Sequence, residues 1–281
     1  MSQGFGERVQ AALRAHGQLC VGIDPHAELL AAWGLGDDAA GVREFGLRTV
    51  DAAAGRVGVV KPQVSFFERF GSKGIAALED VLSAARAAGL LVIADAKRGD
   101  IGSTMDDYAR AWLTPGAPLE ADALTVNPFL GVGALDGTFE LAAKHGKGVF
   151  VLAATSNPEA EGVQRATVAS GSTVSAQIIA EVSARNAALV NPGAWGSFGF
   201  VIGATVDWTQ AGIAPFAPTA PILAPGFGTQ GATPADLRER FGTMSDAVIA
   251  SESRSILSAG PEGLAAAITA RIAAYREVVS V

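Results

Sequence analysis

Eight short apolar runs, rich in β-branched residues, are the feature that most constrains how this 281-residue chain can fold. Within each run the apolar residues are continuous and do not alternate with polar ones, which is typical of parallel strands buried on both faces. These runs predict strands near residues 19–24, 57–63, 91–95, 122–126, 148–153, 198–203, 221–224 and 246–250.

The stretches between the runs predict helices. Residues 72–88 and 173–190 carry apolar positions at helical spacing, and residues 261–278 predict a closing helix with Pro261 in its first turn. The helix signals after the sixth and seventh strands are weak. Eight strands, each followed by a helix or a long loop, favour an α/β fold: a single (β/α)8 TIM barrel over residues 1–281.

Composition excludes several classes of function. The net charge of −7 argues against nucleic-acid or anionic-membrane partners. No uncharged apolar run is long enough to span a membrane, and the first residues lack a signal sequence. Cys20 is the only cysteine and lies in an apolar run, so we expect a buried, inert thiol in a soluble cytoplasmic protein. The three histidines are scattered, so no metal site is expected.

The most informative segment follows the third predicted strand. Asp95 and Lys97 are two residues apart and should share a face, Asp100 follows after a glycine, and Lys61 ends the second strand. Active sites of barrels lie at the carboxyl ends of strands, so these four charges can form one array. A surface salt-bridge network is the plainer alternative. An array of this kind holds a lysine protonated and directed, which suits delivery of a proton to a carbanion.

The last two strands are followed by segments suited to a phosphate. Gly226, Gly228 and Gly231 precede a helix-like stretch, and Arg254 lies in the loop after the eighth strand. The same glycines match Gly-x-Gly-x-x-Gly, with Glu252 about twenty residues further on, so a Rossmann-type NAD enzyme is an alternative. That fold requires more strands after this unit than the remaining chain provides.

Four segments together resemble the orotidine 5′-phosphate decarboxylase family, in the family's order along the chain. They are Asp-Ala-Lys-Arg-Gly-Asp-Ile at 95–101, Val-Gly-Ile-Asp-Pro at 21–25, Val-Lys-Pro-Gln at 60–63 and Pro-Gly-Phe-Gly-Thr-Gln-Gly at 225–231. The resemblance is closest to the longer branch of the family, with Asp-Pro-His after the first strand and Ser-Arg-Ser-Ile after the eighth.

The resemblance implies decarboxylation of orotidine 5′-phosphate to UMP, the last step of de novo pyrimidine synthesis, without a cofactor and in a homodimer with shared active sites. It assigns Lys97 the protonation of C6, with Asp95 placed against the substrate carboxylate. It implies that Asp24 and Lys61 bind the ribose, that Asp100 and Thr104 reach the neighbouring subunit's substrate, that Ser156 contacts the pyrimidine, and that Gln230 and Arg254 hold the phosphate.

Other interpretations stay open at this point. Metal-dependent sugar-phosphate decarboxylases or aldolases of the same superfamily place an acid at the end of the second strand, where this chain has Lys61. A catalytically silent binder of phosphorylated ligands is a third hypothesis. The polar loop 155–172 is either a lid or a plain surface insertion. For Asn127, lining the site and capping a loop are equally open, and for His26 a structural role is favoured over ligand contact.

Overall fold

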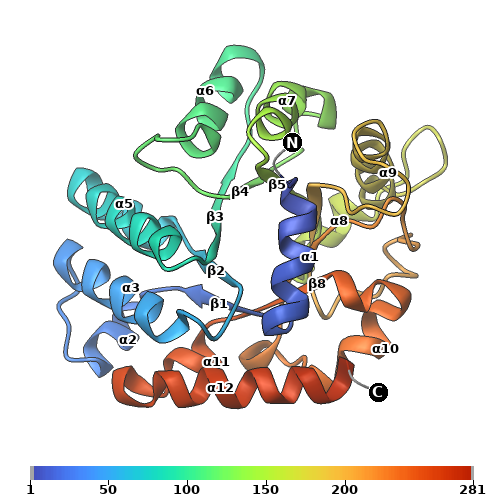
Figure 1. Ribbon diagram of the computed structural model, residues 1–281. Coiled ribbons are helices and arrows are strands. Elements are labelled where there is room, and N and C mark those ends of the chain that lie inside the picture. Colours follow the sequence, from blue (N-terminus) through green and yellow to red (C-terminus); the bar gives the residue numbers. More distant parts are fainter. Residues whose placement is uncertain (1–2, 280–281) are drawn as a thin grey trace.

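The computed structural model, which describes residues 3–279, is a closed barrel of eight parallel strands in the order β1 to β8 (Figure 1). All eight predicted strands are confirmed within a few residues, although β3 continues three residues beyond the predicted end at Asp95. The strands are β1 (Leu19–Ile23), β2 (Val59–Pro62), β3 (Leu91–Arg98), β4 (Ala123–Val126), β5 (Gly148–Ala154), β6 (Phe198–Ile202), β7 (Ile222–Pro225) and β8 (Val248–Glu252).

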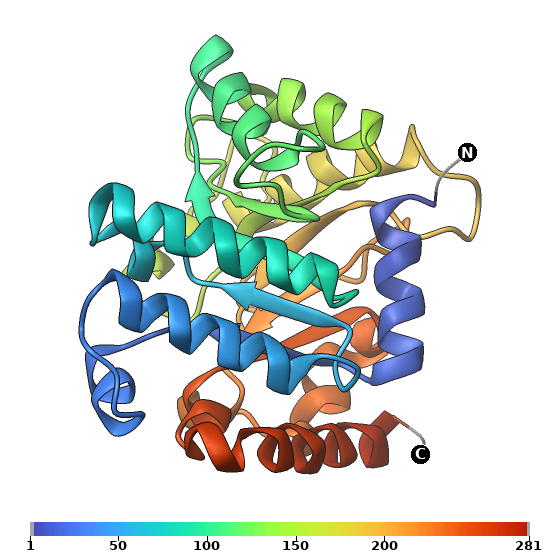
Figure 2. The ribbon, with the colours of Figure 1, turned by 60° about the vertical axis from the view of Figure 1, so that its left-hand side comes forward.

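Helices surround the barrel and run along the outside of the strands (Figure 2). The α-helices are α1 (Phe5–His16), α2 (Ala27–Ala32), α3 (Ala39–Ala53), α4 (Ser65–Glu68), α5 (Gly71–Ala87), α6 (Gly102–Leu113), α7 (Asp136–Lys144), α8 (Glu161–Gln164), α9 (Val174–Ala187), α10 (Leu237–Phe241), α11 (Arg254–Leu257) and α12 (Gly260–Val279). Short 3₁₀ turns are η1 (Val132–Leu135), η2 (Pro158–Ala160), η3 (Gly228–Gln230), η4 (Pro234–Asp236) and η5 (Gly242–Ala247). The three helices predicted from periodicity are confirmed as α5, α9 and α12.

The weak helix signal after the sixth strand has a physical reason. Residues 203–221, between β6 and β7, form no helix, and Pro215, Pro218 and Pro221 interrupt them. Proline lacks the backbone N–H that a helix interior needs. After β7 the chain forms only the short η3, η4, α10 and η5.

One end of the barrel is closed by α1, which lies across it on the side facing the viewer in Figure 1. Phe5, Val9 and Leu13 recur every four residues, so they share one face of the helix, and all three are buried. They pack in one cluster with residues of the barrel interior, among them Phe150, whose ring centroid lies 5.9 Å from that of Phe5. Because α1 seals this end, the opposite end is the one left for chemistry.

Cys20 belongs to the same interior cluster. Burial raises the pKa of its thiol to about 12, so the thiol stays protonated near neutral pH, as the sequence predicts. None of the helices within residues 3–279 is both long and apolar enough to cross a membrane.

A buried ionic cluster connects α1 to the closed end. Asp122, which is 7% exposed, accepts a 2.7 Å hydrogen bond from Arg8 and a 3.0 Å bond from the backbone N–H of Val92. The Lys147 ammonium lies 3.9 Å from the same carboxylate and 2.7 Å from Glu120. One carboxylate therefore joins the first helix, β3 and the segment before β5.

We expect Asp122→Ala to lower the free energy of unfolding by about 3 kcal/mol, because it leaves two cations and a backbone N–H without this partner. Urea unfolding of both proteins measures the difference. Asp80→Ala is the matched control: Asp80 pairs with Arg43 at the surface, where the two side chains are 52% and 48% exposed. That change should cost less than about 1 kcal/mol. Equal losses in the two variants would contradict a special role for the buried cluster.

Candidate active site

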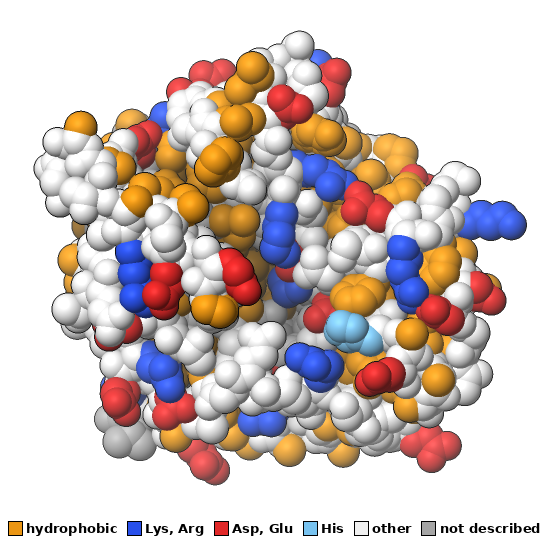
Figure 3. Space-filling model, turned by 180° about the vertical axis from the view of Figure 1, so that it is seen from behind, with side chains coloured by type: hydrophobic (Ala, Val, Ile, Leu, Met, Phe, Trp, Pro, Cys, Tyr) orange, Lys and Arg blue, Asp and Glu red, His pale blue; other side chains and the backbone are white. Residues whose placement is uncertain are grey.

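A cavity of about 470 Å³ opens at the carboxyl ends of the strands. In the space-filling view from this side, lysine and arginine side chains gather around a central hollow (Figure 3). Six of the residues to which the sequence analysis assigned a catalytic or substrate-binding role line the cavity: Asp24, Lys61, Asp95, Lys97, Gln230 and Arg254. They come from β1, β2, β3, β7 and β8 or the loops that follow them, so the barrel brings together residues that are up to 230 positions apart.

An irregularity in β3 aims its charged residues into the cavity. The register with β4 shifts between Ala94, opposite Leu124, and Arg98, opposite Val126. Four residues of β3 therefore span the length of two in β4. Such bulges redirect side chains next to active sites. Lys97 lies in this bulge with a φ of 50°, the only positive φ of a non-glycine residue in the described part of the chain. A non-glycine residue in this region carries a strain of about 1–3 kcal/mol, which the surrounding structure must hold.

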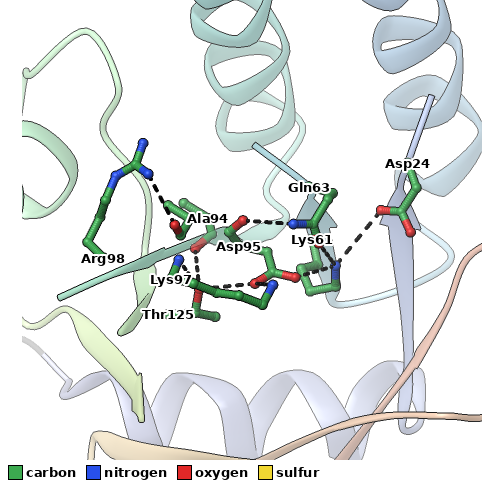
Figure 4. Close-up of polar contacts among 9 residues, drawn as sticks. Asp24, Lys61, Gln63, Ala94, Asp95, Lys97, Arg98 and Thr125 are labelled. Atoms are coloured by element: carbon green, nitrogen blue, oxygen red, sulfur yellow. Dashed lines mark hydrogen bonds and ion pairs between the residues drawn. The ribbon is translucent and has the colours of Figure 1, made fainter. Parts of the chain in front are cut away.

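Asp95, which lines the cavity, lies between two lysines (Figure 4). Its Oδ2 accepts a 3.0 Å hydrogen bond from Lys61 Nζ, and its Oδ1 accepts a 2.5 Å bond from Lys97 Nζ. Lys61 also lies 3.9 Å from Asp24 Oδ1. The sequence prediction that Asp95 and Lys97 converge, with Lys61 beside them, is confirmed.

The two lysines differ in exposure. The side chain of Lys61 is 7% exposed, whereas that of Lys97 is 44% exposed and faces the open cavity. Burial alone would lower the pKa of Lys61, but the negative charges of Asp95 and Asp24 outweigh it and raise that pKa above its usual range. Lys61 is thus a fixed buried cation, and Lys97 is the ammonium that a ligand in the cavity can reach.

Asp95 shows the complementary shift. Burial alone would raise the pKa of its carboxyl, but the charges of Lys61 and Lys97 and their hydrogen bonds lower it to about 2. The carboxylate therefore stays ionised at neutral pH although its residue is only 8% exposed.

Two side chains that the sequence analysis did not single out hold this arrangement. Thr125 Oγ1 accepts a 2.9 Å hydrogen bond from the strained backbone N–H of Lys97 and donates a 3.0 Å bond to Asp95 Oδ1. Gln63 Nε2 donates to the backbone oxygen of Asp95 at 3.3 Å, and its Oε1 lies 3.5 Å from Lys61 Nζ. Both could have been found in the sequence, because Thr125 is a polar residue inside an apolar strand and Gln63 lies two positions after Lys61.

Gln230 and Arg254 stand at the rim of the cavity, in the segments after β7 and β8. Both are exposed. Gly228, two residues before Gln230, has a φ of +75°, and a Cβ at that position would lie 2.5 Å from Ser255 Oγ and 2.7 Å from Glu252 Oε2. Only glycine allows the two loops to approach this closely.

Three predicted site residues lie outside this cavity within the single chain. Asp100 Oδ1 accepts a hydrogen bond from the backbone N–H of Ile101, and Asp100 does not join Lys61, Asp95 and Lys97. Thr104 is exposed on α6. Ser156 is exposed and lines only a smaller neighbouring pocket, whereas the adjacent Thr155 lines both that pocket and the charged cavity. Of the four residues of the predicted array, the single chain brings together Lys61, Asp95 and Lys97 and leaves Asp100 outside.

Asn127 and His26 are each placed near the cavity. Asn127 lines an adjoining cavity that also contacts Lys97, and its Oδ1 accepts a 3.0 Å hydrogen bond from Phe129 N, so it both caps a loop and faces a cavity. His26 lines the charged cavity, with its ring 4.4 Å from that of Phe66.

The closed barrel excludes the Rossmann alternative. Glu252, which that alternative would place on a ribose, is 1% exposed and is bonded to Tyr275, Ser255 and Arg271. Residues 3–279 contain no cluster of three or more histidine, cysteine, aspartate or glutamate side chains suited to a metal ion. The arrangement instead offers a fixed cation at an open position, which can stabilise developing negative charge and donate a proton.

Comparison with known proteins agrees with this geometry. Residues 17–268 match the family model "Orotidine 5′-phosphate decarboxylase / HUMPS family". The chain is 53% identical to the orotidine 5′-phosphate decarboxylase of Salinispora arenicola, with 92% of each chain covered. It is 54% identical to that of a Nocardioides species, with 90% of this chain and 91% of the relative covered.

Solved structures show the same similarity. A Streptomyces avermitilis crystal structure, provisionally assigned the same activity, superposes with a TM-score of 0.94 at 47% identity and covers 100% of this chain and 97% of its own. The Leishmania donovani OMP decarboxylase superposes with a TM-score of 0.75 at 27% identity, covering 98% of this chain and 99% of its own.

The lowered pKa of Asp95 predicts how stability depends on pH. A carboxyl whose pKa falls from 3.8 to about 2 on folding contributes stability that is fully present above pH 3.8 and is lost as pH falls through about 2. We expect Asp95→Asn to have a lower free energy of unfolding than wild type at pH 5. As the pH falls from about 5 to about 2, this difference in free energy should narrow by on the order of 2 kcal/mol. Urea unfolding across this pH range measures it.

Asp107→Asn is the control, because Asp107 and its partner Arg110 are 74% and 64% exposed. Its gap to wild type should stay near zero throughout. A gap for Asp95→Asn that does not change with pH would contradict the lowered pKa.

Proposed function

The chain belongs to the orotidine 5′-phosphate decarboxylase / HUMPS family, and we infer from this that it converts orotidine 5′-phosphate to UMP and carbon dioxide. The observation that carries the inference is the Lys61–Asp95–Lys97 array at the open end of the barrel, in a chain about half identical to named decarboxylases over nine-tenths of its length. This makes it a carboxy-lyase of pyrimidine biosynthesis.

We propose that Lys97 protonates the substrate carbon after carbon dioxide leaves. Loss of carbon dioxide from C6 of the pyrimidine leaves an sp² carbanion that no neighbouring π system absorbs. A fixed ammonium stabilises that charge and then supplies the proton. Lys97 suits the task because its Nζ faces the cavity, while Asp95 at 2.5 Å holds its direction.

The remaining residues of the cavity form two groups, which would bind different parts of the substrate. Asp24 and the buried Lys61, which are 3.9 Å apart, would bind the ribose hydroxyls, and Asp95 would face the substrate carboxylate. Gln230 and Arg254 would hold the phosphate, because barrels commonly bind phosphate in the loops after the last two strands. Arginine grips a phosphate through paired N–H groups.

The loop 155–172 would close over the pyrimidine and bring Ser156 to it. In the structure Thr155 is tied to Gln164 by two hydrogen bonds, from Thr155 N to Oε1 at 2.8 Å and from Nε2 to Thr155 Oγ1 at 3.0 Å. These bonds join the start of the loop to its short helix α8, so the segment can move as a unit.

The reaction needs neither cofactor nor metal in this proposal. Lys61 occupies the end of β2, where the metal-dependent relatives carry an acid, and a charged lysine does not ligate a metal. As an enzyme of pyrimidine synthesis with one buried thiol, the protein would act in the cytoplasm.

We propose a homodimer in which Asp100 and Thr104 reach the neighbouring subunit's site. Four large apolar side chains are exposed on the segments that follow β3 and β4, which pair with each other at Arg98 and Val126: Ile101 at 61%, Tyr108 at 38%, Phe129 at 77% and Leu130 at 53%. Exposed apolar residues grouped in this way are typical of a protein interface. Asp100, which precedes Ile101, would then face the partner's cavity.

We expect Lys97→Ala to lose decarboxylation by at least about a thousand-fold while it stays folded and still binds UMP. Wild-type protein treated with EDTA should retain full turnover. The loss of orotidylate absorbance measures turnover, and calorimetric titration measures UMP binding. Lys73→Ala, which removes an exposed lysine of α5, is the matched control and should keep wild-type activity.

Appreciable turnover by pure Lys97→Ala would remove Lys97 as the proton donor. Recovery of EDTA-treated enzyme only with magnesium would favour the metal-dependent relatives instead.

The shared site predicts complementation between inactive variants. Lys97→Ala and Asp100→Ala should each be nearly inactive, but a hybrid dimer would have one site with both changes and one with neither. After random exchange of equal amounts about half of the dimers are hybrids, so roughly a quarter of wild-type activity should return. The variants are mixed under mildly dissociating conditions, returned to native buffer and assayed. No recovery after verified subunit exchange would place Asp100 in its own chain's site.

A further inference from the structure

A second cavity lies at the opposite end of the barrel from the candidate active site. Its volume is about 660 Å³, and it is bordered by α1, by the segment before β1, by α10 and by α12. The residues that matter here are Gln10, Arg14, Gln18, Trp195, Arg238 and Arg276. A cavity of this volume is in the range of small-molecule sites.

The border of this cavity is rich in positive charge. Among the described residues that line it, Arg14, Arg238 and Arg276 accompany one carboxylate, that of Asp246, although the whole chain has a net charge of −7. Two of these arginines are held by backbone oxygens: Arg238 Nε donates to Val278 at 2.7 Å, and Arg276 donates to Ala15 at 2.8 Å.

Arg14 is oriented by a neighbour. With its amide oxygen turned toward them, Gln10 accepts hydrogen bonds from Arg14 at 3.2 Å and from Trp195 Nε1 at 2.8 Å. A guanidinium has five N–H donors, so this contact fixes Arg14 and leaves it able to bind an anion through a pair of them.

Gln18 gives an independent indication of a ligand. Its residue is only 4% exposed and it lines the cavity, yet its side-chain amide has no hydrogen bond to any residue in the described part of the chain. The amide is therefore open to the cavity and without a partner from the chain, so a polar ligand there would find a donor and an acceptor.

We propose that this cavity binds a phosphorylated small molecule, with Arg14 on the phosphate and Gln18 hydrogen-bonded to the ligand. The anionic group is assigned by the Arg14 guanidinium, and the volume leaves room for an organic part against Trp195. The site shares no residue with the cavity around Lys97, so this inference does not rest on the proposed decarboxylation.

Inorganic pyrophosphate is the probe, titrated calorimetrically into the purified full-length protein. We expect saturable binding that Arg14→Ala weakens at least about tenfold. Arg110→Ala removes an exposed arginine of α6 outside this cavity and should bind as wild type does. Arg254→Ala should also retain this binding, because Arg254 lines the other cavity.

Gln18→Leu gives a second readout. It keeps a similar volume and removes the unpartnered amide, so its melting temperature without pyrophosphate should be no lower than that of wild type. Its affinity for pyrophosphate should fall. Absence of saturable binding, or binding that Arg254→Ala removes and Arg14→Ala leaves unchanged, would overturn the proposal. The second result would leave the assignment of the phosphate end of the active site intact.

Discussion

The ion pairs of Asp95 are the interaction on which the rest of the active end depends. A carboxylate that is 8% exposed can stay ionised only when cations accompany it, and here Lys61 and Lys97 bind its two oxygens. Each lysine imposes a condition on the fold. Strands β1 and β3 must flank β2, so that Lys61 lies close to both Asp24 and Asp95. Strand β3 must also contain a bulge, so that the Lys97 side chain points toward Asp95. Thr125 from β4 then holds the strained Lys97 backbone. Four adjacent strands therefore define one carboxylate and its two ammonium groups.

The two ends of the barrel carry different kinds of polar structure. At the closed end, Asp122 and Lys147 are buried beneath α1 and their hydrogen bonds are made within the chain, which stabilises the fold. At the open end, the Lys97 ammonium remains 44% exposed, Asp24 Oδ1 is buried without a hydrogen bond, and Gln230 and Arg254 stand at the rim. An arrangement with unused donors and acceptors facing a cavity costs stability and is of use only when a ligand arrives.

Much of the fold and of the active end could be predicted from the sequence. The features that were not predicted were missed for identifiable physical reasons. Continuous apolar runs predicted all eight strands, because buried parallel strands need apolar residues on both faces. The spacing of Asp95 and Lys97 predicted their convergence, but no periodicity reveals a bulge, so the positive φ of Lys97 was not foreseen. Helix α1 was missed because it precedes the first strand and so lies outside the alternation of strands and helices from which the fold was predicted, although Phe5, Val9 and Leu13 have helical spacing. The single chain does not test the proposed role of Asp100, because we propose that this residue reaches the site of a neighbouring subunit.

The glycine motif after β7 matches a dinucleotide-binding pattern in sequence, but the structure requires a glycine there for a different reason. Gly226, Gly228 and Gly231 fit a dinucleotide fingerprint, but Gly228 is required because a side chain there would strike Glu252 and Ser255. Glu252 is itself buried, and its carboxylate accepts hydrogen bonds from Ser255 at 2.6 Å and from Tyr275 at 2.7 Å, with Arg271 at 3.3 Å. Burial, together with the negative charge of Glu252, raises the pKa of Tyr275, so its hydroxyl remains a donor. One buried carboxylate thus fastens β8 and α11 to α12 directly beneath the loop that carries Gln230. The acid that the motif would assign to a ribose instead anchors α11, which begins at Arg254, to α12.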